Sequence, residues 1–268
     1  MIQVFRYRFI QSILLLVASF LVASTSFAKV IDESCDSAFA HLWRFSKEHF
    51  QVNEDIVNKN SFVTYRTLGE YSLYLPGFNK ALAELPKDGV WMDLGAGKAV
   101  AMRTAWSQDP SLTRKYFAFG VEIPSDARTA VEDAMVAGNF RYIEGKFESV
   151  DMTQLPKANL ITDVFGAVSY SPDLGRVMTN ALSQLVPGGK MFTYYSMMGI
   201  KIKTGLFKSE DLLDYLRNIK GIEVVDIGDE GAGAVMIQRT EGPLEIPKLK
   251  LEKVRAGKPP QFVYRYVK

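Results

Sequence analysis

Between residues 89 and 240 the chain alternates short apolar runs with segments whose apolar positions recur at helical spacing. This alternation is typical of βαβ units, in which a helix connects each strand to the next parallel strand. Runs such as Asn159-Leu160-Ile161 are apolar at nearly every position, which indicates a sheet covered on both faces. The pattern therefore predicts an α/β fold with a doubly wound, mostly parallel sheet. The expected strands are 90–93, 116–122, 140–143, 159–164, 190–195, 222–227 and 232–238, and the expected helices are 99–107, 125–137, 172–185 and 209–219.

Two regions flank this α/β segment. Before it, residues 37–57 and 68–85 have amphipathic helical spacing, and Pro76-Gly77 interrupts the second of these helices. After it, apolar and polar residues alternate along 244–268, which predicts two strands or an extended arm. A solvated edge hairpin is favoured there over a contact with an acidic substrate. The predicted organisation is an N-terminal helical cap at 29–88, the α/β domain at 89–240 and a C-terminal arm at 241–268.

The N-terminal segment 1–28 has the pattern of an export signal. Arg6 and Arg8 precede an apolar run at 13–22, and Ser26-Phe27-Ala28 supplies the small residues of a cleavage site. The alternative is an uncleaved membrane anchor, because the segment 10–28 is nearly long enough to span a bilayer. Both interpretations predict that the folded domain lies outside the cytoplasm, either exported (periplasmic or secreted) or anchored by its N-terminal helix.

Charge and cysteine content exclude several classes of function. The formal net charge is +2, which the two arginines of the export signal account for, and the C-terminal arm is the basic segment of the chain. A neutral body disfavours nucleic acid as a partner, because binding to a phosphate backbone needs a cationic face. One cysteine and two histidines leave no Cys/His set for a structural zinc ion or an iron–sulfur cluster, so no metal is expected.

The segment 90–99 joins an apolar strand ending in Asp93 to a helix through a glycine-rich turn. Gly95 and Gly97 let the backbone pass close to a ligand, and the start of the following helix offers unpaired N–H groups. The dinucleotide fingerprint needs Gly or Ala where Val100 stands, so a pyrophosphate is not the indicated ligand. The carboxylate of Asp93 would repel pyrophosphate and attract a ligand with a sulfonium or ammonium centre.

The run Asp93-Leu94-Gly95-Ala96-Gly97-Lys98-Ala99 resembles the first motif of the class I S-adenosylmethionine-dependent methyltransferases, with Ala99 where that family often has a third glycine. Pro187-Gly188-Gly189 is similar to the turn before the family's fifth strand, and the last two expected strands would close a seven-stranded sheet as an antiparallel hairpin. The resemblance covers about residues 90–238. It implies a Rossmann-like methyltransferase whose cofactor, S-adenosyl-L-methionine, is bound by Asp93, Gly95, Ala96 and Gly97.

The resemblance extends to the ends of the next two strands. Glu122 ends the strand that follows the glycine turn, where a carboxylate can accept hydrogen bonds from ribose hydroxyls. The next residue, Ile123, is also expected to contact the cofactor. Phe147 stands where the family places an apolar residue over adenine, with ordinary core packing as the equal alternative. Lys146 stands where an acid is common; because lysine only donates, it cannot accept from the adenine amino group.

Residues on the acceptor side are expected after the fourth strand, beside the first. Methyl transfer from a sulfonium is an in-line displacement that needs no metal. Asp163 is the first catalytic candidate, to orient or deprotonate the acceptor while also contacting the cofactor; capping a turn is its alternative role. Tyr170 is the second catalytic candidate, because its side chain could form a wall of the acceptor pocket. The segment lacks Asn-Pro-Pro-Tyr, which disfavours methylation of DNA bases and of glutamine, so the expected acceptor is a small molecule or a protein.

Two other functions stay open. One is a non-catalytic module that binds a nucleoside or a partner protein on the same fold. The other is an NAD(P)-dependent oxidoreductase, which Val100 and the lack of an evident Tyr-x-x-x-Lys pair on a helix disfavour.

Overall fold

The computed structural model describes residues 65–109, 113–195, 199–206, 208–228, 233–255 and 261–267. The chain divides into two units after Gln51, and every described residue belongs to the second unit. The predicted export signal, the helix expected at 37–57 and most of the predicted cap therefore lie outside the described residues. Within the described ranges, no helix is both long enough and apolar enough to cross a membrane.

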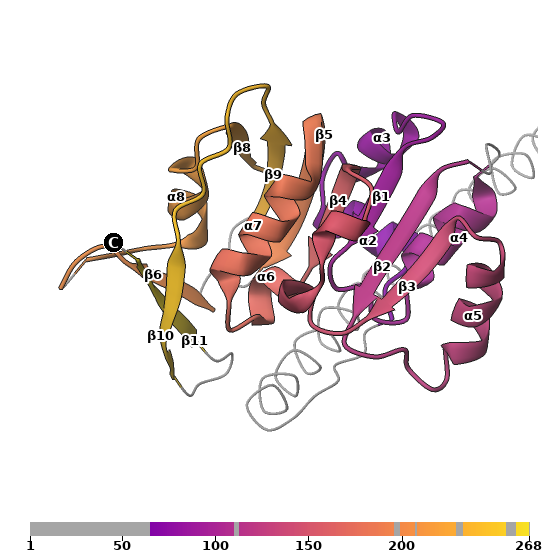
Figure 1. Ribbon diagram of the computed structural model, residues 1–268, viewed down its shortest axis with the longest axis horizontal. Helices are drawn as coiled ribbons and strands as arrows, with labels where there is room; N and C mark the ends of the chain where they lie inside the picture. The colour runs from indigo at the N-terminus through magenta and orange to yellow at the C-terminus, as the bar shows by residue number, and fades with distance from the viewer. Residues whose placement is uncertain are drawn as a thin grey trace, which may run out of the picture. The chain divides into compact units, whose positions relative to one another are not determined.

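A seven-stranded sheet organises this unit, with the strand order β3-β2-β1-β4-β5-β9-β8 (Figure 1). Strands β1 to β5 are mutually parallel, and β9 runs antiparallel to both β5 and β8. The predicted α/β fold with a mostly parallel seven-stranded sheet is thus confirmed. The strands are β1 (Val90–Asp93), β2 (Lys115–Gly120), β3 (Phe140–Glu144), β4 (Ala158–Val164), β5 (Leu185–Tyr195), β8 (Ile222–Asp226) and β9 (Gly233–Arg239).

Helices connect the strands at positions close to those expected. Pro76-Gly77 separates two short helices, and Gly77 starts the second of them with φ at 87°. Asp173 caps the start of the helix that precedes β5, because its side chain accepts a hydrogen bond from the backbone N–H of Arg176. The helices are α2 (Leu68–Tyr74), α3 (Phe78–Ala83), α4 (Val100–Gln108), α5 (Arg128–Val136), α6 (Ala167–Tyr170), α7 (Leu174–Gln184) and α8 (Leu212–Arg217), with single 3₁₀ turns at Phe147–Ser149 and Met152–Gln154.

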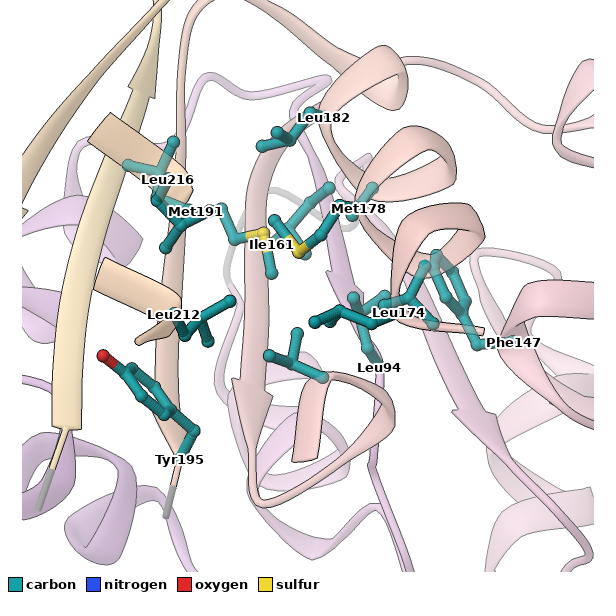
Figure 2. Packing of buried hydrophobic residues seen from close by; sticks show 14 of the residues in the cluster. Leu94, Phe147, Ile161, Leu174, Met178, Leu182, Met191, Tyr195, Leu212 and Leu216 are labelled. Carbon is teal, nitrogen blue, oxygen red and sulfur yellow. The ribbon is translucent and has the colours of Figure 1, made fainter. Parts of the chain in front are cut away.

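The core lies where α7 covers β4 and β5. Leu174, Met178 and Leu182 recur once per turn along α7 and are fully buried. Figure 2 shows them turned toward Ile161 of β4 and Met191 of β5. An apolar stripe of this kind stabilises a helix by removing its side chains from water.

Truncating this stripe is expected to destabilise the protein. Leu182 is fully buried, so Leu182→Ala should lower the free energy of unfolding by about 3 kcal/mol through lost apolar burial and the cavity left behind. Urea denaturation followed by circular dichroism measures this loss. Leu206 is 92% exposed, and Leu206→Ala is the control, with an expected change within about 0.5 kcal/mol. Equal losses for both variants would contradict the packing described here.

A second, four-stranded sheet has the order β10-β11-β6-β7. Its strands are β6 (Ile200–Lys203), β7 (Ser209–Glu210), β10 (Leu249–Arg255) and β11 (Gln261–Tyr266). The antiparallel pair β10–β11 is the hairpin predicted for the C-terminal arm. The expectation of a solvated edge hairpin is wrong for β11, because this strand lies between β10 and β6 and buries Phe262, Val263 and Tyr264. The helix expected from residue 209 begins later, because Ser209 and Glu210 pair with β6.

Candidate functional site

A cavity of about 460 Å³ lies at the carboxyl ends of β1, β2, β3 and β4. Strands β1 and β4 are neighbours in the sheet, although the chain forms β2 and β3 between them. Open α/β sheets bind their ligands at such a switch point, where the strand order reverses. The volume also falls within the range of about 300–1,000 Å³ that is usual for small-molecule sites.

The glycine turn after β1 touches the turn after β4. A Cβ on Gly95 would stand 2.4 Å from the Cα of Gly166, and a Cβ on Gly166 would stand 2.8 Å from the Cα of Gly95. Residues without side chains therefore allow this contact. Gly97 and Ala99 both have φ at 52°, a left-handed conformation that costs alanine about 1 kcal/mol. Ala99 thus takes, at some cost, the conformation that a glycine adopts freely.

The structure brings some of the predicted site residues to the cavity and leaves others outside its lining. Those that line it are Gly95, Gly97, Glu122, Phe147 and Tyr170. Those outside the lining are Asp93, Ala96, Ile123 and Asp163. The backbone N–H of Ala96 donates to the carbonyl oxygen of Phe119 at 2.9 Å, and that of Ile123 donates to the Glu144 carboxylate at 3.3 Å. These two N–H groups are therefore engaged within the protein.

Asp93 is buried behind the glycine turn. Its carboxylate accepts hydrogen bonds from the hydroxyl of Tyr71 at 2.5 Å and from the hydroxyl of Thr162 at 3.0 Å. Burial raises the pKa of Asp93 to about 6, against the opposing effect of these donors and of the nearby Arg66 guanidinium. The carboxylate therefore joins α2 to the sheet. A direct contact between Asp93 and a cofactor stays a prediction.

Asp163 has a similar environment on the neighbouring strand. Its carboxylate accepts hydrogen bonds from the backbone N–H of Val168 at 3.2 Å and from the hydroxyl of Thr193 at 3.3 Å. Burial, together with the charge of Asp93, raises the pKa of Asp163 to about 7 against the opposing effect of these hydrogen bonds. These contacts match the alternative weighed from the sequence, in which Asp163 caps a turn, here the start of α6.

The ends of β2 and β3 supply groups suited to a nucleoside. Glu122 is exposed at the cavity, and Phe147 is a buried lining residue whose ring packs edge-on against Phe119 at 5.1 Å. Sequence reasoning missed Tyr142, whose hydroxyl lies 2.8 Å from the carbonyl oxygen of Gly97 and 3.1 Å from that of Glu122. Tyr142 therefore fixes the glycine turn relative to Glu122.

The space for Tyr142 comes from a glycine on the neighbouring strand. A Cβ on Gly120 would stand 1.9 Å from the Tyr142 hydroxyl, so any other residue there would push the Tyr142 ring out of this position. Gly120 and Gly145 line the cavity together with Gly95, Gly97 and Gly166. Much of the lining is therefore bare backbone, and at Gly145 no atom stands within 4 Å of an added Cβ.

Sequence reasoning placed Tyr170 at the far wall of the cavity but missed the part of this wall that comes from the small sheet. Phe165 follows β4, and Val254 and Phe262 come from the small sheet. Burial raises the pKa of the Tyr170 phenol on the same side, so Tyr170 stays protonated at neutral pH. In the described part of the chain, no group of three or more His, Cys, Asp or Glu side chains is arranged to hold a metal ion.

No protein-family model matches the chain, and no curated protein matches it significantly. Solved structures with a similar fold include an rRNA methylase from Streptococcus thermophilus, at 12% identity over 67% of this chain and 100% of that chain, with a TM-score of 0.43. A precorrin-6y C5,15-methyltransferase from Geobacter metallireducens has 16% identity over 61% and 87% of the two chains, with a TM-score of 0.40. An O-methyltransferase family protein from Burkholderia thailandensis has 11% identity over 75% and 71%, with a TM-score of 0.44.

These TM-scores are below 0.5, so we take the fold from the strands themselves. Five parallel strands in the order β3-β2-β1-β4-β5 are followed by the antiparallel β9, with β8 at the edge. The glycine turn follows the central strand β1, and the cavity lies at the carboxyl ends beside it. This chain has the Rossmann-like fold of the class I S-adenosylmethionine-dependent methyltransferases.

Proposed function

We propose that this protein binds S-adenosylmethionine in the cavity and transfers its methyl group to an acceptor by in-line displacement. The observation that carries the proposal is the composition of the cavity at the switch point. A glycine turn, an exposed carboxylate and an aromatic ring follow β1, β2 and β3 in that order, as Gly95, Glu122 and Phe147.

The lining residues fit the proposed cofactor. The Glu122 carboxylate can accept hydrogen bonds from both ribose hydroxyls, and the Phe147 ring offers an apolar surface to adenine. Gly95 and Gly97 border the part of the cavity that would hold the amino-acid part of the molecule. Asp93 directly precedes the lining residues Leu94 and Gly95, and its negative charge would favour a positively charged sulfur in the cavity.

When bound, the cofactor would supply a methyl group on a positively charged sulfur. A lone pair of the acceptor would bond to the methyl carbon while the carbon–sulfur pair stays on sulfur, and the acceptor's proton would pass to the solvent as the methylated product leaves. Positioning accounts for much of the acceleration of such a displacement. The protein contributes apolar walls that exclude water, and the protonated Tyr170 can donate a hydrogen bond that orients the acceptor.

A conservative substitution tests the nucleoside end. Glu122→Gln keeps the size of the side chain but removes the charge that strengthens its hydrogen bonds, so the affinity for S-adenosylhomocysteine should fall about tenfold. Isothermal titration calorimetry measures this change. Asp133 is exposed on α5 and does not line the cavity, so Asp133→Asn should leave the affinity unchanged. Unchanged affinity for Glu122→Gln, or tighter binding of NAD than of S-adenosylhomocysteine by the wild-type protein, would overturn the proposal.

One observation favours a second function, the non-catalytic nucleoside-binding module. Both buried aspartates, Asp93 and Asp163, lie outside the cavity lining, so neither is placed to take a proton from an acceptor. A radiolabel assay with S-adenosyl-[methyl-³H]methionine and cell extracts separates the two functions. Binding of S-adenosylhomocysteine without transfer of label to any fraction would favour the binding module.

Export of the protein is a separate proposal, carried by the sequence of the N-terminal segment 1–28. N-terminal sequencing of the mature protein tests it. We expect a start at Lys29, and a cytosolic protein that starts at Met1 would contradict it.

A further inference from the structure

The cavity has two chemically different sides. Its charged lining side chains come from the segments after β2 and β3; they are Glu122, Lys146 and Glu148. The opposite side comes from the segment after β4 and from the small sheet, and we call its side chains the apolar wall: Phe165, Tyr170, Pro172, Val254 and Phe262. Among the described lining residues, the apolar wall contains no side chain that is charged at neutral pH, because Tyr170 stays protonated.

The small sheet is attached firmly to the α/β domain beside this wall. The Tyr264 hydroxyl donates to the carbonyl oxygen of Ser171 at 2.7 Å, and Ser171 itself lines the cavity. A Cβ on Gly175 would stand 3.1 Å from backbone atoms of Leu249, so α7 and β10 are in close contact. These contacts hold Val254 and Phe262 in place, and the apolar wall is therefore a built surface of the cavity.

Phe165 is held in the wall at a conformational cost. Its φ of 46° is left-handed, a region that residues with a side chain rarely adopt. The ring is buried and packs edge-on against Tyr194 at 4.8 Å. Such strain at a cavity points to a role for the side chain in that cavity.

We propose that the methyl acceptor is a small neutral molecule whose aromatic or aliphatic body packs against the apolar wall. This inference deepens the proposed function and rests on it. An ion placed against Phe165, Val254 and Phe262 would lose water without gaining a partner, whereas a neutral apolar body gains from burial there. The carboxylate of Glu148 is one of the charged groups that line the same cavity. A cationic acceptor bound through Glu148 is therefore the competing outcome of the test.

Three probes that share a naphthalene ring and differ in charge distinguish these outcomes. Calorimetry of the full protein, saturated with S-adenosylhomocysteine, measures the affinities of neutral 2-naphthol, anionic 2-naphthoate and cationic 2-naphthylmethylamine. We expect 2-naphthol to bind at least tenfold more tightly than either ion. Tighter binding of the amine, or displacement of 2-naphthol by S-adenosylhomocysteine, would overturn the inference.

A matched pair of variants locates the binding. Val254 is 42% exposed and lines the cavity, whereas Val225 is 45% exposed on β8 and does not. Val254→Asp should weaken 2-naphthol at least tenfold without changing the affinity for S-adenosylhomocysteine, and Val225→Asp should change neither. Unchanged 2-naphthol binding in Val254→Asp contradicts the inference alone. Wild-type protein that binds 2-naphthol when S-adenosylhomocysteine does not bind contradicts the proposed function instead.

Discussion

Gly95→Ala is expected to destabilise the protein and to abolish measurable binding of S-adenosylhomocysteine. The added Cβ would stand 2.4 Å from the Cα of Gly166, and no flexible side chain is available there to move aside. The two turns must therefore separate, and overpacking of this kind costs about 3 kcal/mol. Because both turns line the cavity, the same movement should weaken the ligand at least a hundredfold.

Thermal denaturation and calorimetry measure the two effects of Gly95→Ala independently. Gly166→Ala should behave alike, because its Cβ would stand 2.6 Å from the Asp163 carboxylate as well as close to Gly95. Gly205 has an unstrained φ and no atom within 4 Å of an added Cβ, so Gly205→Ala is the control. A Gly95→Ala protein that melts and binds like the control would show that the two turns do not touch as described.

The large sheet could be predicted from the sequence because each of its strands carries its own signal. The run 90–93 ends in a glycine turn, and the expected strands at 140–143 and 159–164 match β3 and β4 to within one residue. Strand β5 begins earlier than expected, at Leu185, because it pairs with Ala158 before the irregularity at Pro187-Gly188-Gly189. A local pattern does not reveal that pairing.

The small sheet, in contrast, could not be predicted as a whole from the sequence. Strands β6 and β7 are four and two residues long, too short for a period-two pattern to stand out. Their place in a sheet depends on β11, which pairs Ile200 with Phe262, far away in the sequence. The contribution of Val254 and Phe262 to the cavity follows from this distant pairing, and for that reason sequence reasoning favoured a solvated hairpin over a substrate contact for the C-terminal arm.

Sequence reasoning could predict which residues stand at the ends of the strands beside the cavity. It could not predict in which direction their side chains point. Glu122 and Phe147 follow parallel strands, and the carboxyl ends of those strands meet at one edge of the sheet. Asp93 also ends a strand, but all four residues of β1 are buried, so alternation could not indicate which face its carboxylate takes. The direction of the Asp93 carboxylate is determined by its hydrogen bonds with the hydroxyls of Tyr71 on α2 and Thr162 on β4. Neither residue was recognisable in the sequence as a partner of Asp93.

The two buried aspartates should make the protein less stable as the pH rises. Asp163 has its pKa raised from 3.8 to about 7, and Asp93 from 3.8 to about 6. Because the folded state then binds more protons than the unfolded chain between about pH 4 and pH 7, the free energy of unfolding falls across this window and is level above it. A shift of about three pKa units corresponds to about 4 kcal/mol for Asp163.

Asp163→Asn removes the titrating group and keeps an oxygen that can accept from the Val168 N–H. We expect the difference in unfolding free energy between pH 5 and pH 8 to shrink by about 3 kcal/mol in this variant, because the wild-type protein must ionise a buried carboxyl over that range. Urea denaturation at several pH values measures the difference. Asp88 is exposed, and Asp88→Asn should leave the profile unchanged. A wild-type protein whose stability rises between pH 5 and pH 8 would mean that Asp163 stays ionised in the folded protein over this range, and the raised pKa would then be wrong.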